Sequence, residues 1–420
     1  ISFWNLSGFT TIYNLTSDEI EFLSNMHVIC FCETWLASDS VNVPYFLKNY
    51  DMYHVKATRV FQKGRPSGGL SIFCKAGLFS EVKTLVCKNF FLCLNLKTKY
   101  DSFVIGIVYL KPGANNDFYV ELLQEELNNL NSLFSDCHIV IGGDFNCRIG
   151  ALNSLENEIF VGTNLKSKRT SVDEVVNNRG IRIVETMENL GMILCNGRSP
   201  SDSPSKFSYI GVLGCSLVDH VWVSSSFLPY ISDFEIVKFS NFSDHNLLQL
   251  SLYSEKTRHC NLSNKKENVV VLNRNSDLLN KFTEQIGQSK TYYCIMSKTN
   301  EDHEKFLTRI KEIMCNIGML KTKNNKIENR NKPWFDSTCF EAKKEAALLY
   351  KKFIKNRSCV NALGDYLASK KNYKNIIKNS KNQYLNNITA TLRNTKNAQE
   401  FWTVVRKYNF KPPIKNNISL

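Results

Sequence analysis

The first 255 residues consist largely of short apolar segments, each the length of a β-strand, separated by polar turns. Such segments at close spacing predict a protein built mainly of sheets. The expected strands are 2–5, 28–32, 68–75, 90–97, 103–109, 138–142, 218–223, 234–239 and 247–252, and the expected helices are 17–26, 117–134 and 178–189. Many strands with few long helices predict an α/β fold, with two sheets packed face to face and helices outside.

The composition changes after residue 255. Residues 1–255 contain 20 Lys and Arg against 26 Asp and Glu, a net charge of −6, whereas 256–420 contain 33 against 13, a net charge of +20. We expect a strand-rich domain (1–255), a polar linker with one helix near 306–319 (256–332), and a basic helical connector (333–420). The connector helices, expected at 337–357, 362–394 and 397–408, have too few apolar residues to bury a core alone, so they should pack on something else. Their charge is typical of a segment that attracts polyanions.

Fourteen cysteines are scattered along the chain without a C-x-x-C pair. Because this is a poor pattern for zinc, we expect free, mostly buried thiols in a reducing compartment, the cytoplasm or the nucleus. No apolar run approaches the roughly 20 residues of a membrane helix, so no membrane partner is expected. The chain begins with Ile1 rather than Met, and we expect it to be a fragment.

A carboxylate and an amide follow one buried strand in Gly142-Gly143-Asp144-Phe145-Asn146. Asp144 can orient or deprotonate a water molecule, and Asn146 can donate a hydrogen bond to a phosphoryl oxygen as charge develops on it. Alone, an Asp-x-Asn sequence after a strand is more often a turn held by its own side chains.

A second group of ionisable residues lies near the end of the strand-rich domain. Asp219 stands in an otherwise apolar strand, which is unfavourable unless the carboxylate has a partner. His245, in Ser243-Asp244-His245, can be that partner, because an Asp fixes the tautomer of a histidine and increases its basicity. A satisfied surface histidine is the alternative. His220 alternates to the other face of its strand and is expected to be structural.

Three more polar residues stand at strand ends. Glu33 follows the apolar segment 28–32, Asn5 follows Phe3-Trp4, and Tyr109 follows 105–108. A hard oxygen ligand such as Glu33, with Asn5 to hold it, suits magnesium. The Tyr109 hydroxyl can donate to a phosphate, although a half-buried tyrosine is common in strands. Because these residues share one position relative to their strands, we expect them to meet around one cleft.

The order of these segments is more specific than any one of them. Asn-x-x-Gly, strand-Glu-Thr, strand-Tyr, Gly-Asp-Phe-Asn, Ser-x-x-Asp-His and Ser-Asp-His follow one another over about 245 residues. In this order they resemble the endonuclease/exonuclease/phosphatase superfamily, which includes pancreatic deoxyribonuclease and the apurinic endonucleases. The resemblance is closest to the endonuclease domain of non-LTR retrotransposon polyproteins. That closer match is carried by Gly68-Gly69-Leu70, Asn178-Arg179-Gly180 and the basic tail that opens at Lys332-Pro333-Trp334-Phe335-Asp336.

The resemblance implies a four-layered α/β sandwich that nicks DNA with Mg²⁺, or with Mn²⁺ in its place. By the same resemblance, Asn5 and Glu33 would be at the metal, and Asp244 would assist at the metal or with His245. Tyr109 and Asn146 would contact the scissile phosphate. Asp144 would position or activate the attacking water. Asp219 would orient His245, which would act as a base or as a transition-state donor. One departure is Ser7, where related enzymes often carry Asp or Asn near the metal.

Three functions fit these observations. The first is a retroelement-type DNA endonuclease whose basic tail contacts DNA or retroelement RNA, with a reverse transcriptase domain following in the full-length chain. The second keeps the fold and metal but acts on a phospholipid or inositol phosphate. The third is an inactive or domesticated copy that only binds nucleic acid. No reverse-transcriptase Asp-Asp motif is present in the sequence, so this chain alone should not polymerise.

Overall fold

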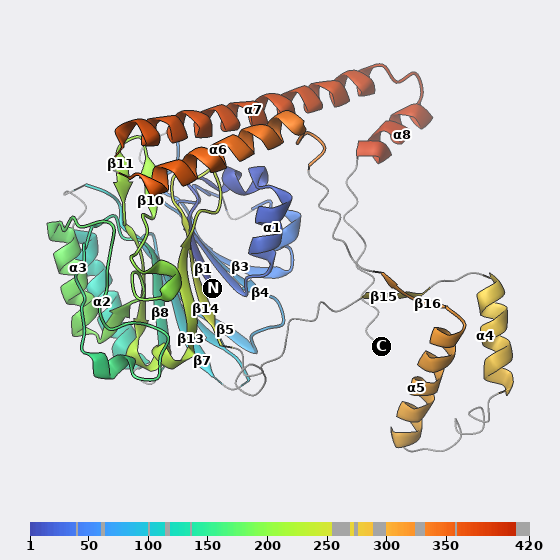
Figure 1. The fold of residues 1–420 in the computed structure, drawn as a ribbon, viewed down its shortest axis with the longest axis horizontal. Coiled ribbons are helices and arrows are strands. Elements are labelled where there is room, and N and C mark those ends of the chain that lie inside the picture. Colours follow the sequence, from blue (N-terminus) through green and yellow to red (C-terminus); the bar gives the residue numbers. More distant parts are fainter. Residues whose placement is uncertain are drawn as a thin grey trace. The chain divides into compact units, whose positions relative to one another are not determined.

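The protein forms two compact units in a computed structural model, 1–258 together with 330–420, and 259–329 (Figure 1). The structure describes residues 1–38, 41–59, 64–99, 101–113, 118–134, 137–253, 269–272, 276–288, 300–323, 332–357 and 359–408. The first unit holds the two large sheets and, although it is interrupted in sequence, also the C-terminal helices. The second unit is a small separate element.

The described part of the first unit contains two six-stranded sheets. The first has the order β13-β14-β1-β2-β4-β3 and the second has the order β5-β6-β7-β8-β12-β9. The strands of the first are β1 (Ser2–Asn5), β2 (Val28–Cys32), β3 (Tyr50–Val55), β4 (Leu70–Lys75), β13 (Ile231–Val237) and β14 (Leu247–Leu252). Those of the second are β5 (Glu81–Lys88), β6 (Phe91–Lys97), β7 (Ser102–Tyr109), β8 (His138–Asp144), β9 (Met192–Leu194) and β12 (Asp219–Ser224).

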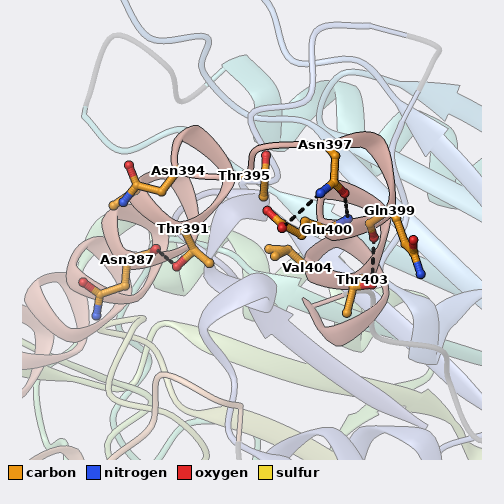
Figure 2. A pocket seen from close by; sticks show the side chains of 10 residues that line it. Asn387, Thr391, Asn394, Thr395, Asn397, Gln399, Glu400, Thr403 and Val404 are labelled. Atoms are coloured by element: carbon orange, nitrogen blue, oxygen red, sulfur yellow. Dashed lines mark hydrogen bonds between the residues drawn. The ribbon is translucent and has the colours of Figure 1, made fainter.

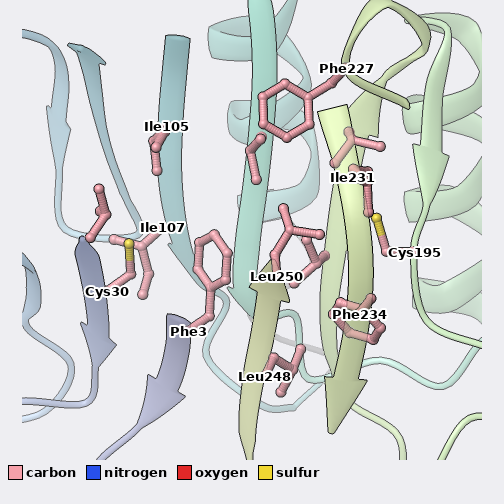
Figure 3. Packing of buried hydrophobic residues seen from close by; sticks show 14 of the residues in the cluster. Phe3, Cys30, Ile105, Ile107, Cys195, Phe227, Ile231, Phe234, Leu248 and Leu250 are labelled. Carbon is pink, nitrogen blue, oxygen red and sulfur yellow. The ribbon is translucent and has the colours of Figure 1, made fainter. Parts of the chain in front are cut away.

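Three apolar clusters hold the layers together. The central cluster fills the space between the sheets, where Phe3 of β1 meets Ile107 of β7 and Leu248 of β14 (Figure 3). A second cluster joins the β5–β9 sheet to α2 (Phe118–Leu133) and α3 (Asn178–Asn189), and a third covers the other sheet with α1 (Ser17–Ser24). Helix, sheet, sheet and helix therefore stack as four layers, and the expected fold is confirmed.

The C-terminal helices begin at an Asp cap. The Asp336 carboxylate accepts a hydrogen bond from the Cys339 N–H, which satisfies a free donor in the first turn of α6 (Ser337–Lys355). Helices α7 (Val360–Arg393) and α8 (Ala398–Tyr408) follow, close to the expected bounds. Helices α6 and α7 form an antiparallel hairpin (Figure 1). Polar side chains such as Asn387, Thr391 and Glu400 line a hollow of about 830 Å³ between the end of α7 and α8 (Figure 2).

The α6–α7 hairpin packs on the strand-rich domain, as its sparse apolar residues led us to expect. Tyr373 and Ile377 of α7 pack with Phe242, and Phe353 and Tyr366 pack around Ile210. Residue 210 belongs to a small two-stranded sheet of β10 (Tyr209–Gly211) and β11 (Gly214–Ser216). The hairpin is therefore part of the same folded unit as the sheets.

The second unit contains more structure than the single helix expected near 306–319. It has α4 (Ser276–Gln288), α5 (Asn300–Asn316), and a two-stranded sheet of β15 (Val269–Leu272) and β16 (Leu320–Lys323). The apolar residues of α4 recur at helical spacing between polar ones, so the helix is hidden in a stretch whose overall composition is polar. In the parts of the chain that the structure describes, no helix combines the length and apolarity needed to cross a membrane.

Candidate active site

The candidate residues lie where strands of both sheets end together. Strands β7 and β8 are parallel, with Tyr109 paired with Asp144, and β12 runs antiparallel to β8, with Asp219 opposite Asp144. In the facing sheet, Asn5 is the last residue of β1, and His245 precedes β14, the antiparallel neighbour of β1. Strand register therefore brings together residues that are up to 240 positions apart in the sequence.

Asp144, Asp219 and His245 form the centre of the site. The Nδ1 atom of His245 is 2.8 Å from Oδ2 of Asp219, and its Nε2 atom is 4.0 Å from Oδ2 of Asp144. All three side chains are buried. Burial by itself would lower the pKa of His245, but the carboxylates of Asp219, Asp144 and Glu33 raise it to about 9. These charges favour the protonated ring, and its Nε2 faces the Asp144 carboxylate.

Two amides hold the Asp144 carboxylate from opposite sides. The side chain of Asn5 donates to Oδ2 of Asp144 at 2.9 Å, and the backbone N–H of Asn146 donates to Oδ1 at 2.9 Å. The Asn146 side chain instead donates to the carbonyl of Leu110 at 2.9 Å, from a left-handed backbone with φ 47°. Asp144 is thus fixed in orientation before any substrate arrives.

A glycine allows β8 to reach the site. Gly143 has φ 135°, and a Cβ there would overlap the Val108 carbonyl oxygen and lie 2.9 Å from the Val108 nitrogen. Gly142 makes room from the other side, because a Cβ there would lie 2.6 Å from the Phe3 ring of the facing sheet. Gly143 therefore lets β8 pair with β7 just before Asp144, and Gly142 lets the two sheets approach each other closely.

Glu33 and Tyr109 form a second edge of the site. Glu33 has a left-handed backbone with φ 49°, and its carboxylate accepts a hydrogen bond from the Trp35 indole at 3.3 Å. Burial, and then the charge of the neighbouring Glu33, raise the pKa of Tyr109, so its hydroxyl stays protonated and able to donate. The Arg65 guanidinium lies 3.8 Å from the centre of the Trp35 ring. Sequence patterns did not single out Trp35 or Arg65, although both flank motifs used above.

Asp244 is placed differently from the other expected residues. Its carboxylate lies 2.8 Å from Nζ of Lys370 in α7 and 3.8 Å from Nζ of Lys374. It does not join the cluster of Asp144, Asp219 and His245. Lysines more than 120 residues later in the sequence contact only one of its oxygens, Oδ1, so the place of Asp244 at a metal stays a prediction. The N–H of Ser7, the residue that departs from related sequences, donates to Oδ1 of Asn5 at 3.0 Å.

Side-chain hydrogen bonds to the backbone fix the start of β12, and no sequence motif indicates them. The Ser208 hydroxyl accepts hydrogen bonds from the N–H groups of Val218 and Asp219, and the Asn196 side chain donates to the Asp219 carbonyl. His220 is buried on the opposite face of the strand, stacked on Phe145 with ring centres 5.2 Å apart. It is structural, as its position in the strand predicted.

The site has the chemistry of a metal centre. Ligand atoms of Asp144, Asp219 and His245 lie within 4.8 Å of one another, and Glu33 adds a further carboxylate. Because a protonated His245 has no free lone pair for a metal, the carboxylates are the candidate ligands. Burial, and then the charges of Asp219 and Glu33, raise the pKa of Asp144 well above its usual range. This repulsion between carboxylates is what a bound divalent cation would relieve, and carboxylate oxygens are the ligands that Mg²⁺ prefers.

A known protein family matches nearly all of the strand-rich domain. The model of the Endonuclease/Exonuclease/phosphatase family matches residues 3–245, which is more than half of the chain and contains every strand end described above. The chain belongs to this family. Enzymes of the endonuclease/exonuclease/phosphatase family are hydrolases that act on phosphodiester bonds. No curated protein matches the chain in sequence.

The chain is also similar, at low identity, to three solved structures. The endonuclease domain of TRAS1, a telomere-specific non-LTR retrotransposon, is 15% identical, with a TM-score of 0.41 over 60% of this chain and 98% of that one. The apurinic endonuclease LMAP from Leishmania major is 12% identical, with a TM-score of 0.44 over 59% and 86%. The 3′ phosphatase NExo from Neisseria, bound to a product DNA hairpin, is 12% identical, with a TM-score of 0.42 over 60% and 98%.

Proposed function

We propose that this chain is a metal-dependent DNA endonuclease that nicks one strand and so makes the primer end used in retrotransposition. The observation that carries the proposal is the buried Asp219–His245 pair, whose free Nε2 faces Asp144 beside Glu33. The ordered segments that resemble retrotransposon endonucleases support the narrower assignment.

The surroundings of Asp144 and His245 favour a particular role for each side chain. Asp144, held by Asn5 and Asn146, orients the attacking water and accepts its proton, which its raised pKa makes easier. The protonated Nε2 of His245 donates to a phosphoryl oxygen as negative charge develops there. The high pKa of His245 favours this donor role over that of a base.

A metal ion at Glu33 and Asn5 is the other part of the proposal. Mg²⁺, or Mn²⁺ in its place, would supply positive charge for the developing phosphorane and the leaving oxygen. Tyr109, kept protonated beside Glu33, would donate to the phosphate. The Asn5 Nδ2 donates to Asp144 and its Oδ1 accepts from the Ser7 N–H, so Asn5 would hold the metal with the remaining lone pair of Oδ1.

The surroundings of the site favour a nucleic acid over a lipid. The α6–α7 hairpin brings five lysines between 370 and 381 to the unit that holds the site. Strand β10 pairs with His245 at its first residue, Tyr209, and the turn after β10 exposes Val212 and Leu213, which are 88% and 95% accessible. Exposed apolar side chains of this kind can enter a DNA groove and contact bases.

Relaxation of supercoiled plasmid tests the proposal. Nicking should require Mg²⁺ or Mn²⁺, stop on chelation, and be abolished by Asp144→Ala and by His245→Ala. Asp51→Ala, which removes an exposed carboxylate from β3, is the matched control and should nick normally. Extension of the nicked product by a polymerase would then test for a usable 3′ end.

Two outcomes would reject this function. Plasmid binding without nicking in every metal would favour an inactive, nucleic-acid-binding copy. Release of a phosphorylated head group from a phospholipid or inositol phosphate, with no plasmid nicking, would favour a lipid phosphodiesterase.

A further inference from the structure

The segment that carries His245 is covered by helix α7. Nζ of Lys370 donates to the carbonyl of Ser243 at 2.9 Å and to Oδ1 of Asp244 at 2.8 Å. Lys370 is only 3% exposed, and it lies 125 residues after the histidine. The next residue of α7, Lys371, is exposed.

Ser243 connects Lys370 to the histidine. The Ser243 hydroxyl accepts a hydrogen bond from the His245 N–H at 3.0 Å and donates to the Asn5 carbonyl at 2.7 Å. The carbonyl of the same residue is the acceptor for Lys370. The Trp4 indole holds the His245 carbonyl from the other side at 3.0 Å. A shift of Ser243 would therefore move both His245 and the end of β1.

Helix α7 is itself fixed at this point. Tyr366 and Tyr373, one turn before and one turn after Lys370, are buried, and Tyr373 packs against Phe242, directly before Ser243. The ammonium group is thus held between two anchored turns. A buried lysine costs stability unless it is paired, and an apolar residue could fill such a place at lower cost. A role in positioning explains why a charged side chain is used.

We propose that Lys370 is a positioning residue for His245, so that the α6–α7 hairpin completes the active site from outside the region that the family model matches. The effect on catalysis rests on the proposed nuclease function, whereas the effect on the His245 segment does not.

The test compares Lys370→Met with Lys371→Met in the full chain. Both remove one positive charge from α7, but only the first releases Ser243. Because small misplacements of catalytic groups cost on the order of 100-fold, Lys370→Met should lower kcat for nicking by roughly 10- to 100-fold with little change in KM. Lys371→Met should keep kcat and raise KM slightly, through weaker attraction to DNA.

Hydrogen exchange at residues 242–248, followed by mass spectrometry, gives a second readout that needs no activity. Exchange should be faster in Lys370→Met and unchanged in Lys371→Met. If the unmodified chain does not nick DNA, the proposed function fails, and exchange alone decides the role of Lys370. Unchanged kcat together with unchanged exchange would overturn the proposal.

Thermal unfolding shows whether a variant has lost activity only because it is unfolded. If Lys370→Met is unfolded, Lys370→Gln, which keeps a donor for Ser243, takes its place and should show a smaller loss of kcat. Unfolding of both variants would make Lys370 a purely structural residue and would also overturn the proposal.

Discussion

Gly143 gives the most direct test of how the strands deliver Asp144. Gly143→Ala adds one methyl group where φ is 135°, a backbone that costs about 1–3 kcal/mol for an L side chain. The new Cβ also overlaps the Val108 carbonyl oxygen of the adjacent strand β7, and forced overlap costs about 1–3 kcal/mol. We therefore expect a loss of about 2–6 kcal/mol in the free energy of unfolding.

Gly162→Ala is the matched control. Gly162 also has a left-handed backbone, with φ 77°, but a Cβ there would meet no atom within 4 Å. This variant should lose only about 1–2 kcal/mol, the conformational part of the cost. Urea unfolding followed by tryptophan fluorescence measures both changes, because Trp4 and Trp222 are buried in the sheets.

Activity adds a second measurement on the same pair. Moving β8 away from β7 shifts Asp144 relative to Tyr109, so Gly143→Ala should lower kcat under conditions where it is still folded, and Gly162→Ala should not. Equal losses of stability in the two variants would refute the steric part of the reasoning. Normal kcat in a folded Gly143→Ala variant would refute the link to the site.

Three other predictions concern charge. Burial, and then the charge of Arg169, lower the pKa of His220 from 6.5 to about 3, so its contribution to stability is complete above pH 6.5 and is lost as the pH falls toward 3. His220→Phe should therefore be more stable than the unmodified chain by about 2 kcal/mol at pH 5, with a smaller difference at pH 7.5. Urea unfolding at the two pH values measures this difference. Asp219→Asn removes the charge that raises the pKa of His245, so the alkaline limit of nicking in a pH–rate profile should move below about pH 9. Arg65→Ala should raise KM for DNA several-fold and reduce its salt dependence, with kcat unchanged, because the guanidinium on Trp35 lies at the edge of the site.

The interior of the fold could be predicted because buried strands are apolar runs. The edge strands β3 and β5 were missed for the opposite reason, since most of their residues are exposed or half-buried and they contain no continuous apolar segment. Asn5, Tyr109, Asp144, Asp219 and His245 were recognised because strand ends meet at one place, whatever the loops between them do. The site then followed from local patterns taken in order.

The position of Asp244 could not be predicted in the same way. Its partner Lys370 lies 126 residues later, in a helix whose apolar pattern indicates packing but not where it packs. The charge of each segment did not indicate this contact either, because Asp244 belongs to residues 1–255, with a net charge of −6, and Lys370 belongs to the rest of the chain, with a net charge of +20. Only the folded unit shows that this basic extension meets the acidic domain next to the histidine.

The contact between the basic extension and the acidic domain gives a physical reason for the difference in charge between the two parts of the chain. A site built from Glu33, Asp144 and Asp219 repels phosphates as well as attracting metal ions, so a polyanion needs positive charge from elsewhere to approach it. In the proposed nuclease, lysines of α7 would supply this charge, because the contact of Lys370 with Asp244 holds the helix beside the site. The same lysine fixes the His245 segment through Ser243. One helix would then both attract the substrate and orient the catalytic histidine. The two variants should separate these effects, because Lys370→Met should change mainly kcat and Lys371→Met should change mainly KM.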